Sequence, residues 1–294
     1  MTLTQLRTFL AIADTGSVHA AARQLYVTQS AVSASLNALQ KSLGLQLLER
    51  DGRGLRLTRA GAVYADHVRT ALGLLDQART AAAAETDPER GELRIAALTT
   101  AGEQILPGVL ASFRERHPHV GVRLEVGNRE HVRRLLERHE VDLVLGGRPE
   151  PGREIEVLAT RPHELIVVAH APGPGDPAWL AAQTWLLREP GSGTRAITES
   201  FLAQLELDPP PRTLTLGSNT AVIESALAGL GITLVSRDAV SRHLDDGHLT
   251  EISTPATPLP RDWHLTANPG PKAPTTALFT THLTTTAHFH TPKD

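Results

Sequence analysis

The sequence of 294 residues contains no cysteine. That absence excludes a disulfide framework, thiolate metal sites and cysteine nucleophiles, and it fits a reducing compartment. Aromatic residues make up only 3% of the chain, which argues against stacking of single-stranded bases on aromatic side chains. No apolar run approaches the roughly 18 residues that a membrane-spanning helix requires. The polar start of the chain also lacks the basic and apolar regions of a signal peptide, so we expect a cytoplasmic protein without membrane contact.

Common catalytic motifs are missing as well. The sequence has no GxxxxGK[ST], HExxH or GxSxG pattern, and Gly191-x-Gly193 lacks the third glycine of a dinucleotide fingerprint. Three histidines near the end of the chain, His282, His288 and His290, match no metal-ligand spacing. We therefore predict that the protein is not an enzyme and needs neither a cofactor nor a metal.

Charge is distributed unevenly along the chain. The formal net charge is −3, but residues 1–60 carry seven basic and three acidic groups, a balance of +4, which leaves −7 for the rest. A basic end on an acidic body predicts a nucleic-acid-binding head. Because aromatic residues are scarce, duplex DNA is the favoured partner.

Residues 1–44 show the pattern of three short helices. Apolar residues recur at three- and four-residue steps until Thr15 and Gly16 end the first helix. Ser17 is placed to cap the second helix, Thr28 is placed to cap the third, and Gly44 ends it. This succession, with a brief turn before the third helix, predicts a helix-turn-helix.

The third helix has two different faces. Val32, Leu36, Leu39 and Leu43 fall within a narrow arc that faces the core. Short hydrogen-bonding side chains, a methyl group and a cation lie opposite, which suits a helix in the major groove. The alternative is an ordinary packed helix with a solvated outer face. The predicted base-contacting set, including the helix start, is Thr28, Gln29, Ser30, Ser33, Ala34, Asn37 and Lys41.

A short hairpin follows this helix. Asp51-Gly52-Arg53-Gly54 is a turn signal, and Leu55-Arg56-Leu57 alternates like a strand. Arg50, Arg53 and Arg56 on this predicted β wing would contact phosphates or an adjacent minor groove. Thr58 then caps a helix through about residue 84, too long for one small head, so we expect it to pair with a second copy. The alternative is a helix packed on its own domain.

From Glu92 onward, strands alternate with helices. This rhythm predicts parallel sheets covered by helices, arranged as two lobes. The expected domains are a winged helix-turn-helix at 1–58, a dimerisation and linker helix at 59–87, and an effector-binding domain at 91–294. Its lobe one would comprise about 91–161 plus 267–294, and its lobe two about 162–266.

The first 65 residues resemble the LysR-type transcriptional regulators. The resemblance rests above all on Ala20-Ala21-Ala22-Arg23-Gln24-Leu25, Val27-Thr28-Gln29-Ser30-Ala31-Val32-Ser33 and Leu45-Gln46-Leu47-Leu48-Glu49-Arg50. The rhythm after residue 91 is similar to that family's effector domain. The chain departs from the family at Gln40, where Glu is common, at Leu48, where Phe is common, and at Ala34, where many members have Arg.

The resemblance implies an α+β fold class. It comprises an N-terminal winged helix-turn-helix, a long linker helix and a two-lobed α/β periplasmic-binding-protein-like effector domain. Three segments are similar to a subgroup containing Calvin-cycle and anion-assimilation regulators: Gly147-Arg148-Pro149, Arg188-Glu189-Pro190-Gly191-Ser192-Gly193-Thr194-Arg195 and Leu216-Gly217-Ser218-Asn219.

Candidate effector-binding residues follow strands or begin helices. Pro190-Gly191-Ser192-Gly193-Thr194 precedes a helix, where glycines admit a ligand, hydroxyls donate and the helix start favours an anion. The alternative is an ordinary N-cap. The resemblance implies that Thr99 and Thr100 face Ser192 and Thr194 across a cleft. The full predicted set is Thr99, Thr100, Arg148, Ser192, Gly193, Thr194, Asn219 and Thr220.

These patterns predict a DNA-binding transcriptional regulator controlled by a small, anionic metabolite between two α/β lobes. The expected partners are double-stranded DNA with an inverted-repeat site and further copies of the chain in a homodimer or homotetramer, with RNA polymerase as a further candidate. The alternative is a small-molecule sensor that acts through a protein partner. A steep salt dependence of DNA binding would distinguish the two.

Overall fold

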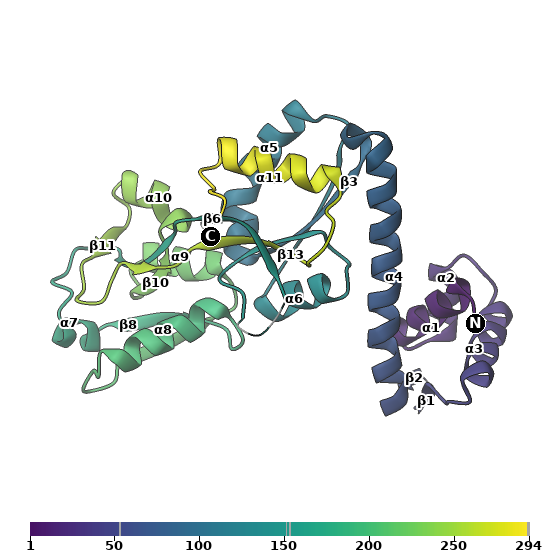
Figure 1. Ribbon diagram of the computed structural model, residues 1–294. Helices are drawn as coiled ribbons and strands as arrows, with labels where there is room; N and C mark the ends of the chain where they lie inside the picture. Colours follow the sequence, from purple (N-terminus) through teal and green to yellow (C-terminus); the bar gives the residue numbers. More distant parts are fainter. Residues whose placement is uncertain (53, 151, 153, 293–294) are drawn as a thin grey trace. The chain divides into compact units, whose positions relative to one another are not determined.

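The computed structural model describes residues 1–52, 54–150, 152 and 154–292 (Figure 1). The chain divides into two compact units. One comprises residues 1–79 with 137–140, and the other comprises residues 80–136 with 141–294. Across the ranges described, no helix is both long enough and apolar enough to cross a membrane.

The first unit contains three short helices, a hairpin and most of a long helix. Their bounds are α1 (Leu3–Thr15), α2 (Val18–Gln24), α3 (Gln29–Leu43), β1 (Leu48–Asp51), β2 (Gly54–Leu57) and α4 (Arg59–Thr86). The side chains of Thr2, Ser17 and Thr28 accept backbone N–H bonds at the three helix starts. Gly16 and Gly44 end α1 and α3 in the left-handed region. The predicted helix-turn-helix and its wing are confirmed.

The core of this unit fixes the end of α3 against the hairpin. Phe9, Ile12, Leu39 and Leu47 are fully buried. The side-chain oxygen of Gln40 accepts a hydrogen bond from the backbone N–H of Leu47 at 2.7 Å. Gln40 therefore anchors the third helix to the start of the wing.

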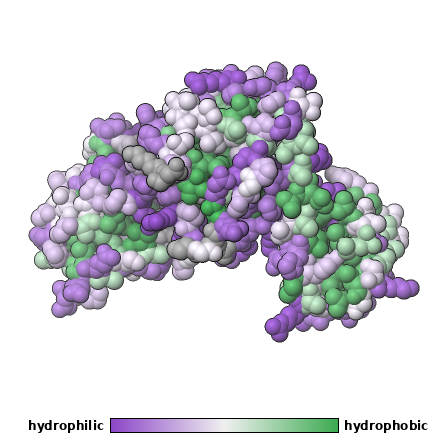
Figure 2. Space-filling model, viewed as in Figure 1, coloured by the Kyte–Doolittle hydropathy of each residue, from purple (hydrophilic) through white to green (hydrophobic). Residues whose placement is uncertain are grey.

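Apolar side chains also reach the surface of this unit, as Figure 2 shows. On α4, Val63, Leu74 and Leu75 are half or more exposed. The opposite side of the same helix contributes Ala65 and Val68 to the core. α4 therefore has an apolar surface beyond the one that its own unit covers.

The second unit is built around two sheets. The first has the order β4-β3-β5-β13-β6, with β3 (Glu92–Leu98), β4 (Gly121–Gly127), β5 (Leu143–Gly146), β6 (Glu156–Arg161) and β13 (Trp263–Ala267). The second has the order β10-β7-β11, with β12 also paired to β7. Its strands are β7 (Glu164–Ala169), β10 (Thr233–Ser236), β11 (Thr250–Ile252) and β12 (Leu259–Pro260). The parallel pair β8 (Thr184–Arg188) and β9 (Arg212–Leu216) adjoins it through a bridge between Trp185 and Ile232.

Helices connect most of these strands. They are the turn η1 (Pro88–Arg90), the π-helix η2 (Ala101–Ile105), α5 (Leu106–Arg116), α6 (Arg129–Glu137), α7 (Pro177–Ala182), α8 (Gly193–Gln204), α9 (Asn219–Leu227), α10 (Arg237–Asp245) and α11 (Pro274–Thr286). Figure 1 shows α5 and α11 lying together beside the first sheet. Phe113 of α5 and Phe279 of α11 are fully buried and meet edge to face, with ring centroids 5.1 Å apart.

The prediction of parallel sheets holds for β3, β4 and β5 but not for the other strands of these two sheets. β3 pairs in parallel with β4 and β5, but β13 pairs antiparallel with β5 and β6. Strands β10, β11 and β12 are all antiparallel to β7. The reason is that the chain leaves the first sheet through β6 to enter the second at β7 and returns from β12 to β13, so the returning strand runs opposite to the outgoing one.

One expected boundary also differs from the structure. The chain returns to the first sheet at Trp263, a few residues before the expected 267. β5 begins at Leu143, directly after Asp142, which forms a buried ion pair with Arg94, 2.7 Å between Oδ1 and Nη2.

Candidate DNA-binding surface and effector cleft

Helix α3 presents the polar face that the sequence predicts. Val32, Leu36 and Leu39 are buried, whereas Ser33 is half-buried. The other six residues of the predicted base-contacting set are exposed: Thr28, Gln29, Ser30, Ala34, Asn37 and Lys41. Helical spacing thus brings all seven to the solvent side of one helix.

The start of α3 is organised by hydrogen bonds. The Thr28 hydroxyl accepts the backbone N–H of Ala31 at 3.2 Å and lies 3.0 Å from the hydroxyl of Ser30. The Gln29 side-chain nitrogen lies 2.8 Å from Nδ1 of His19 on α2. His19 therefore holds Gln29 in place, a role that the sequence did not suggest.

The basic residues of the wing have different environments. Arg50 is exposed, whereas Arg56 forms an ion pair with Glu49 across the hairpin at 2.6 Å. Arg53 lies outside the described residues. Tyr26, two residues before the N-cap residue of α3, is 96% exposed and has a positive φ of 56°.

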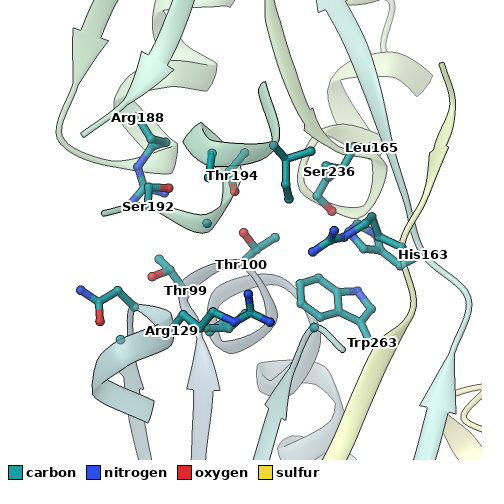
Figure 3. A pocket seen from close by; sticks show the side chains of 18 of the residues that line it. Thr99, Thr100, Arg129, His163, Leu165, Arg188, Ser192, Thr194, Ser236 and Trp263 are labelled. Carbon is teal, nitrogen blue, oxygen red and sulfur yellow. The ribbon is translucent and has the colours of Figure 1, made fainter. Parts of the chain in front are cut away.

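A cleft of about 390 Å³ lies between the two sheets of the second unit (Figure 3). Arg188, Ser192, Thr194 and Ser236 come from one wall, and Thr99, Thr100, Arg129 and Trp263 come from the other. Most of its wall consists of residues at or just after the carboxyl ends of β3, β4, β5, β8 and β10. This is the crevice position at which open α/β sheets bind ligands.

Five residues of the predicted effector set line this cleft: Thr99, Thr100, Ser192, Gly193 and Thr194. Thr99 and Thr100 begin the helical segment that continues as η2, a π-helical turn of the type often found at functional sites. Gly102 allows this turn to pack closely against β4, because a Cβ at this position would lie only 2.7 Å from the Val126 side chain.

Ser192 and Ser236 bring hydroxyl groups into the other wall. Ser192 is the N-cap of α8, but its hydroxyl accepts the Arg195 N–H only at the long distance of 3.5 Å. Ser236 is 3% exposed, and within the described residues its hydroxyl has no hydrogen-bond partner. A buried polar group without a partner is costly, so a bound polar ligand would satisfy it.

The other three predicted effector residues lie outside the cleft wall. Asn219 is 9% exposed and donates to the Thr100 hydroxyl at 2.9 Å, so it supports the wall from behind. Thr220 is exposed. Arg148 contributes its backbone carbonyl, which accepts a hydrogen bond from Nη2 of Arg129 at 2.8 Å. Arg195 is also turned away, in an ion pair with Glu199 at 2.7 Å.

Three arginines that the predicted effector set did not include line the cleft: Arg129, Arg188 and Arg261. Arg129 lies two residues after the end of β4 and Arg188 ends β8, so the rule that ligands bind at strand ends would have found these two. Arg261 lies between β12 and β13 and carries no such signal.

Arg188 is neutralised within the wall. Its guanidinium forms two parallel hydrogen bonds with the Glu189 carboxylate, both at 2.7 Å, and also contacts the side-chain oxygen of Asn219. The hydrogen bond from Arg188 lowers the pKa of the Glu189 carboxyl, against the opposing effect of burial. Glu189 therefore stays ionised and cancels the charge of Arg188.

A cluster of polar groups lies where the chain crosses between the sheets. The Asp238 carboxylate accepts from Arg161 at 2.8 Å and from the Trp263 indole at 3.3 Å. His163 stacks on Trp263, with its Nδ1 3.5 Å from Asp238. The imidazole of His163, followed by the charge of Arg161, lowers the pKa of the Asp238 carboxyl. These contacts join the end of β6, the start of α10 and the start of β13.

Two family models match this chain. One is described as "Bacterial regulatory helix-turn-helix protein, lysR family" and matches residues 3–62. The other is described as "LysR substrate binding domain" and matches residues 86–287.

Two curated relatives are similar over most of their length. The transcriptional regulator CfxR of Cupriavidus necator is 36% identical over 273 residues, which cover 90% of this chain and 85% of the relative. The RuBisCO operon transcriptional regulator of Allochromatium vinosum is 33% identical over 271 residues, which cover 90% and 89%.

The second unit is similar to a solved structure. This is the regulatory domain of CcmR from Synechocystis in complex with 2-PG, which is 25% identical with a TM-score of 0.60. The similarity covers 66% of this chain and 97% of that one.

Proposed function

Because the chain belongs to the LysR family of DNA-binding transcriptional regulators, we propose that a small anion bound in the cleft controls its action at a promoter. The predicted resemblance to LysR-type regulators, and to the subgroup that contains Calvin-cycle regulators, is confirmed by these relatives. The family match of residues 3–62 favours a DNA partner over the alternative of a protein partner.

The observation that carries this proposal is the convergence of hydroxyl groups and a helix start on one cleft. Thr100, Ser192 and Thr194 line it together, and Gly193 begins α8 there. The Thr100 hydroxyl accepts from Asn219, so its own hydrogen is available to donate. The free N–H groups and positive dipole of α8 favour an anion near Ser192. The unpartnered hydroxyl of Ser236 is a further donor.

The relative with a bound ligand supports an anionic effector. The CcmR regulatory domain was solved with 2-PG and resembles the second unit of this chain. We assign winged helix-turn-helix, linker and effector-binding roles to residues 1–58, 59–87 and 91–294, with the return to lobe one at Trp263. In this scheme α3 contacts base edges and the wing contacts phosphates.

The exposed apolar side chains of α4 support self-association. Val63, Leu74 and Leu75 would be covered if α4 packs against its counterpart in a homodimer, which a homotetramer would contain twice. Two heads related by twofold symmetry require an inverted-repeat site, with half-sites about one helical turn or a multiple apart. RNA polymerase would be a further partner if the protein activates transcription.

The same function places the protein in the cytoplasm, with the DNA, and assigns it no catalytic step and no cofactor. The relatives named above are transcriptional regulators. The effector would act by binding one arrangement of the oligomer more tightly than another, because only such differential affinity can shift an equilibrium.

The test is calorimetric titration of the full chain with inorganic phosphate and 2-phosphoglycolate, followed by DNA-binding measurements with and without the tighter ligand. We expect saturable binding of at least one anion and roughly tenfold weaker binding to Thr100→Ala. Thr213→Ala removes an exposed hydroxyl on β9, outside the cleft, and should bind like the unmodified protein. Unchanged affinity in Thr100→Ala would place the site elsewhere.

A further inference from the structure

Arg129 brings an unbalanced positive charge to the cleft. It is the first residue of α6, two residues after the end of β4, and it lines the cleft. Its guanidinium donates to the Arg148 carbonyl at 2.8 Å, which orients it but does not neutralise it. Among the described residues, no carboxylate forms an ion pair with Arg129.

Arg261 lies near Arg129 on the same wall. Its backbone N–H donates to the carbonyl of His163 at 2.6 Å, which fixes the crossing between β12 and β13. Its guanidinium lies over Gly147, since a Cβ there would be 3.6 Å from Nη2 of Arg261. Gly147, Arg129 and Arg261 all line the cleft.

The two guanidinium groups repel each other. Burial and the charge of Arg129 both lower the pKa of Arg261. Asp262 also lines the cleft, but it is not among the groups that shift the pKa of Arg261. Within the described ranges, Arg261 likewise has no ion pair. Both arginines are exposed. Two neighbouring like charges at one cleft still disfavour each other, and an anion bound between them would offset this repulsion.

The third arginine of the cleft provides the contrast. Arg188 faces the same cavity, but Glu189 neutralises it through two hydrogen bonds. The positive charge that remains is therefore concentrated at Arg129 and Arg261. Figure 3 shows Arg129 on the wall opposite Ser192 and Thr194.

We propose that Arg129 and Arg261 form a second anion subsite, so that the effector carries two anionic groups rather than one. This inference rests on the proposed function, which supplies the site of the first group at Thr100, Ser192 and Thr194. Guanidinium groups bind carboxylates and phosphates through paired, charge-assisted hydrogen bonds. A ligand with an anion at each end would add contacts to Arg129 and Arg261 to those that the site of the first group makes across the cleft, so it would favour the closed arrangement more than a single oxyanion does.

The experiment compares two ligands that differ at one end. 2-Phosphoglycolate carries a phosphate and a carboxylate, whereas 2-hydroxyethyl phosphate has a hydroxymethyl group in place of the carboxylate. Calorimetry on the full chain should show that 2-phosphoglycolate binds roughly tenfold or more tightly, the effect of one charge-assisted contact. Arg129→Gln and Arg261→Gln should each abolish most of this preference and change the affinity for 2-hydroxyethyl phosphate little.

The control removes a positive charge elsewhere. Arg123→Gln acts on an exposed arginine that pairs with Glu125, outside the cleft, and should keep the full preference. Thermal unfolding and DNA binding show whether each variant is folded. Arg129→Lys and Arg261→Lys retain the charge, so they should restore part of the preference and separate charge from side-chain packing.

The outcomes separate the two proposals. If the unmodified protein binds both ligands equally, with weaker binding in Thr100→Ala, the proposed function holds and the second subsite is wrong. The second subsite is also wrong if Arg129→Gln and Arg261→Gln lose affinity for the two ligands equally. It is wrong as well if both variants keep the preference for 2-phosphoglycolate. If neither ligand nor inorganic phosphate binds, the anionic effector itself is wrong and this inference fails with it.

Discussion

The side-chain amide of Asn219 donates a hydrogen bond to the hydroxyl of Thr100 at 2.9 Å. This contact joins the first residue of α9 to the helical segment that follows β3. Asn219 also accepts a hydrogen bond from Arg188. The sequence placed Asn219 among the ligand contacts, whereas the structure places it behind the wall, where it orients two residues that face the cleft.

Replacing Asn219 should therefore weaken effector binding indirectly. In Asn219→Ala, Thr100 loses its donor and Arg188 loses its contact, so the cleft wall is less well ordered. We expect roughly three- to tenfold weaker binding of 2-phosphoglycolate by calorimetry, the range of one ordinary hydrogen bond. Thr220→Ala, at the exposed neighbouring position, is the matched control. Equal affinities for the two variants would exclude the positioning role.

Helix α3 and the wing should contribute differently to DNA recognition. Once footprinting has identified a promoter site, Ser33→Ala should reduce the preference for that site over scrambled DNA, because a base-edge contact contributes about 1–3 kcal/mol of discrimination. Arg50→Ala should weaken binding to both sequences similarly, since phosphate contacts carry no sequence information. Fluorescence anisotropy with both duplexes measures the two effects. Equal losses on both duplexes for Ser33→Ala would contradict its base-contacting role.

Salt should control the affinity of the head for DNA. We assume that the head neutralises roughly five to seven phosphates. The logarithm of the association constant for DNA should then fall linearly with the logarithm of the salt concentration, with a slope of about −0.9 for each phosphate. Titrations between about 50 and 200 mM salt should then show a steep decline, and Arg50→Ala should reduce the slope by about one. A flat response would exclude the DNA-binding model of the head.

The junction between α4 and the wing should tolerate no side chain at Gly61. A Cβ on Gly61 would lie 1.9 Å from the carbonyl oxygen of Leu47. We expect Gly61→Ala to destabilise the first unit by about 1–3 kcal/mol, the usual cost of overpacking, as measured by denaturant unfolding. Gly108 on α5 has nothing within 4 Å of the corresponding position. Gly108→Ala should therefore be neutral or stabilise by up to about 1 kcal/mol, and similar losses in both variants would contradict this account.

Stability should depend on pH through His282. This residue is 3% exposed, its Nε2 lies 2.9 Å from the Ser112 hydroxyl, and its ring meets Phe113 edge to face. Burial, followed by the charge of Arg116, lowers the pKa of the His282 imidazole. The unfolded chain therefore binds a proton below about pH 6.5 that the folded chain rejects, so stability falls as the pH drops through this range.

His282→Leu removes this titration. The Tm of the variant should decrease less on acidification from about pH 7.5 to about pH 5 than the Tm of the unmodified protein. His119→Gln replaces an exposed histidine of the same unit and is the control. Its Tm should change with pH as the Tm of the unmodified protein does. Parallel Tm profiles for His282→Leu and the unmodified protein would show that another group causes the acid sensitivity.

The N-terminal unit could be predicted almost completely from the sequence. Its helix ends depend on local interactions, such as the N-cap bond of Thr28 and the left-handed conformation of Gly44. Its recognition face follows from helical spacing around Val32 and Leu36. Both kinds of information lie within a few residues along the chain.

The cleft could be predicted only in part. Thr99, Thr100 and Ser192 follow strands or begin helices, a position that sequence pattern can locate. Arg261 faces the cleft because β13 returns antiparallel to the first sheet, and no local pattern indicates that return. The same long-range pairing explains why the predicted parallel sheets are mixed.

The sequence by itself thus determined the elements, the basic head and the family, because caps, periodicity and charge act between near neighbours. Only the tertiary structure decided which side chains meet. It neutralised Arg188 with Glu189 and placed Asn219 behind Thr100. In the part of the chain that the structure describes, it left Arg129 and Arg261 without an ion-paired carboxylate. These relationships depend on strand pairing between segments far apart in the chain, so the chemistry of the cleft becomes defined only when the sheets form.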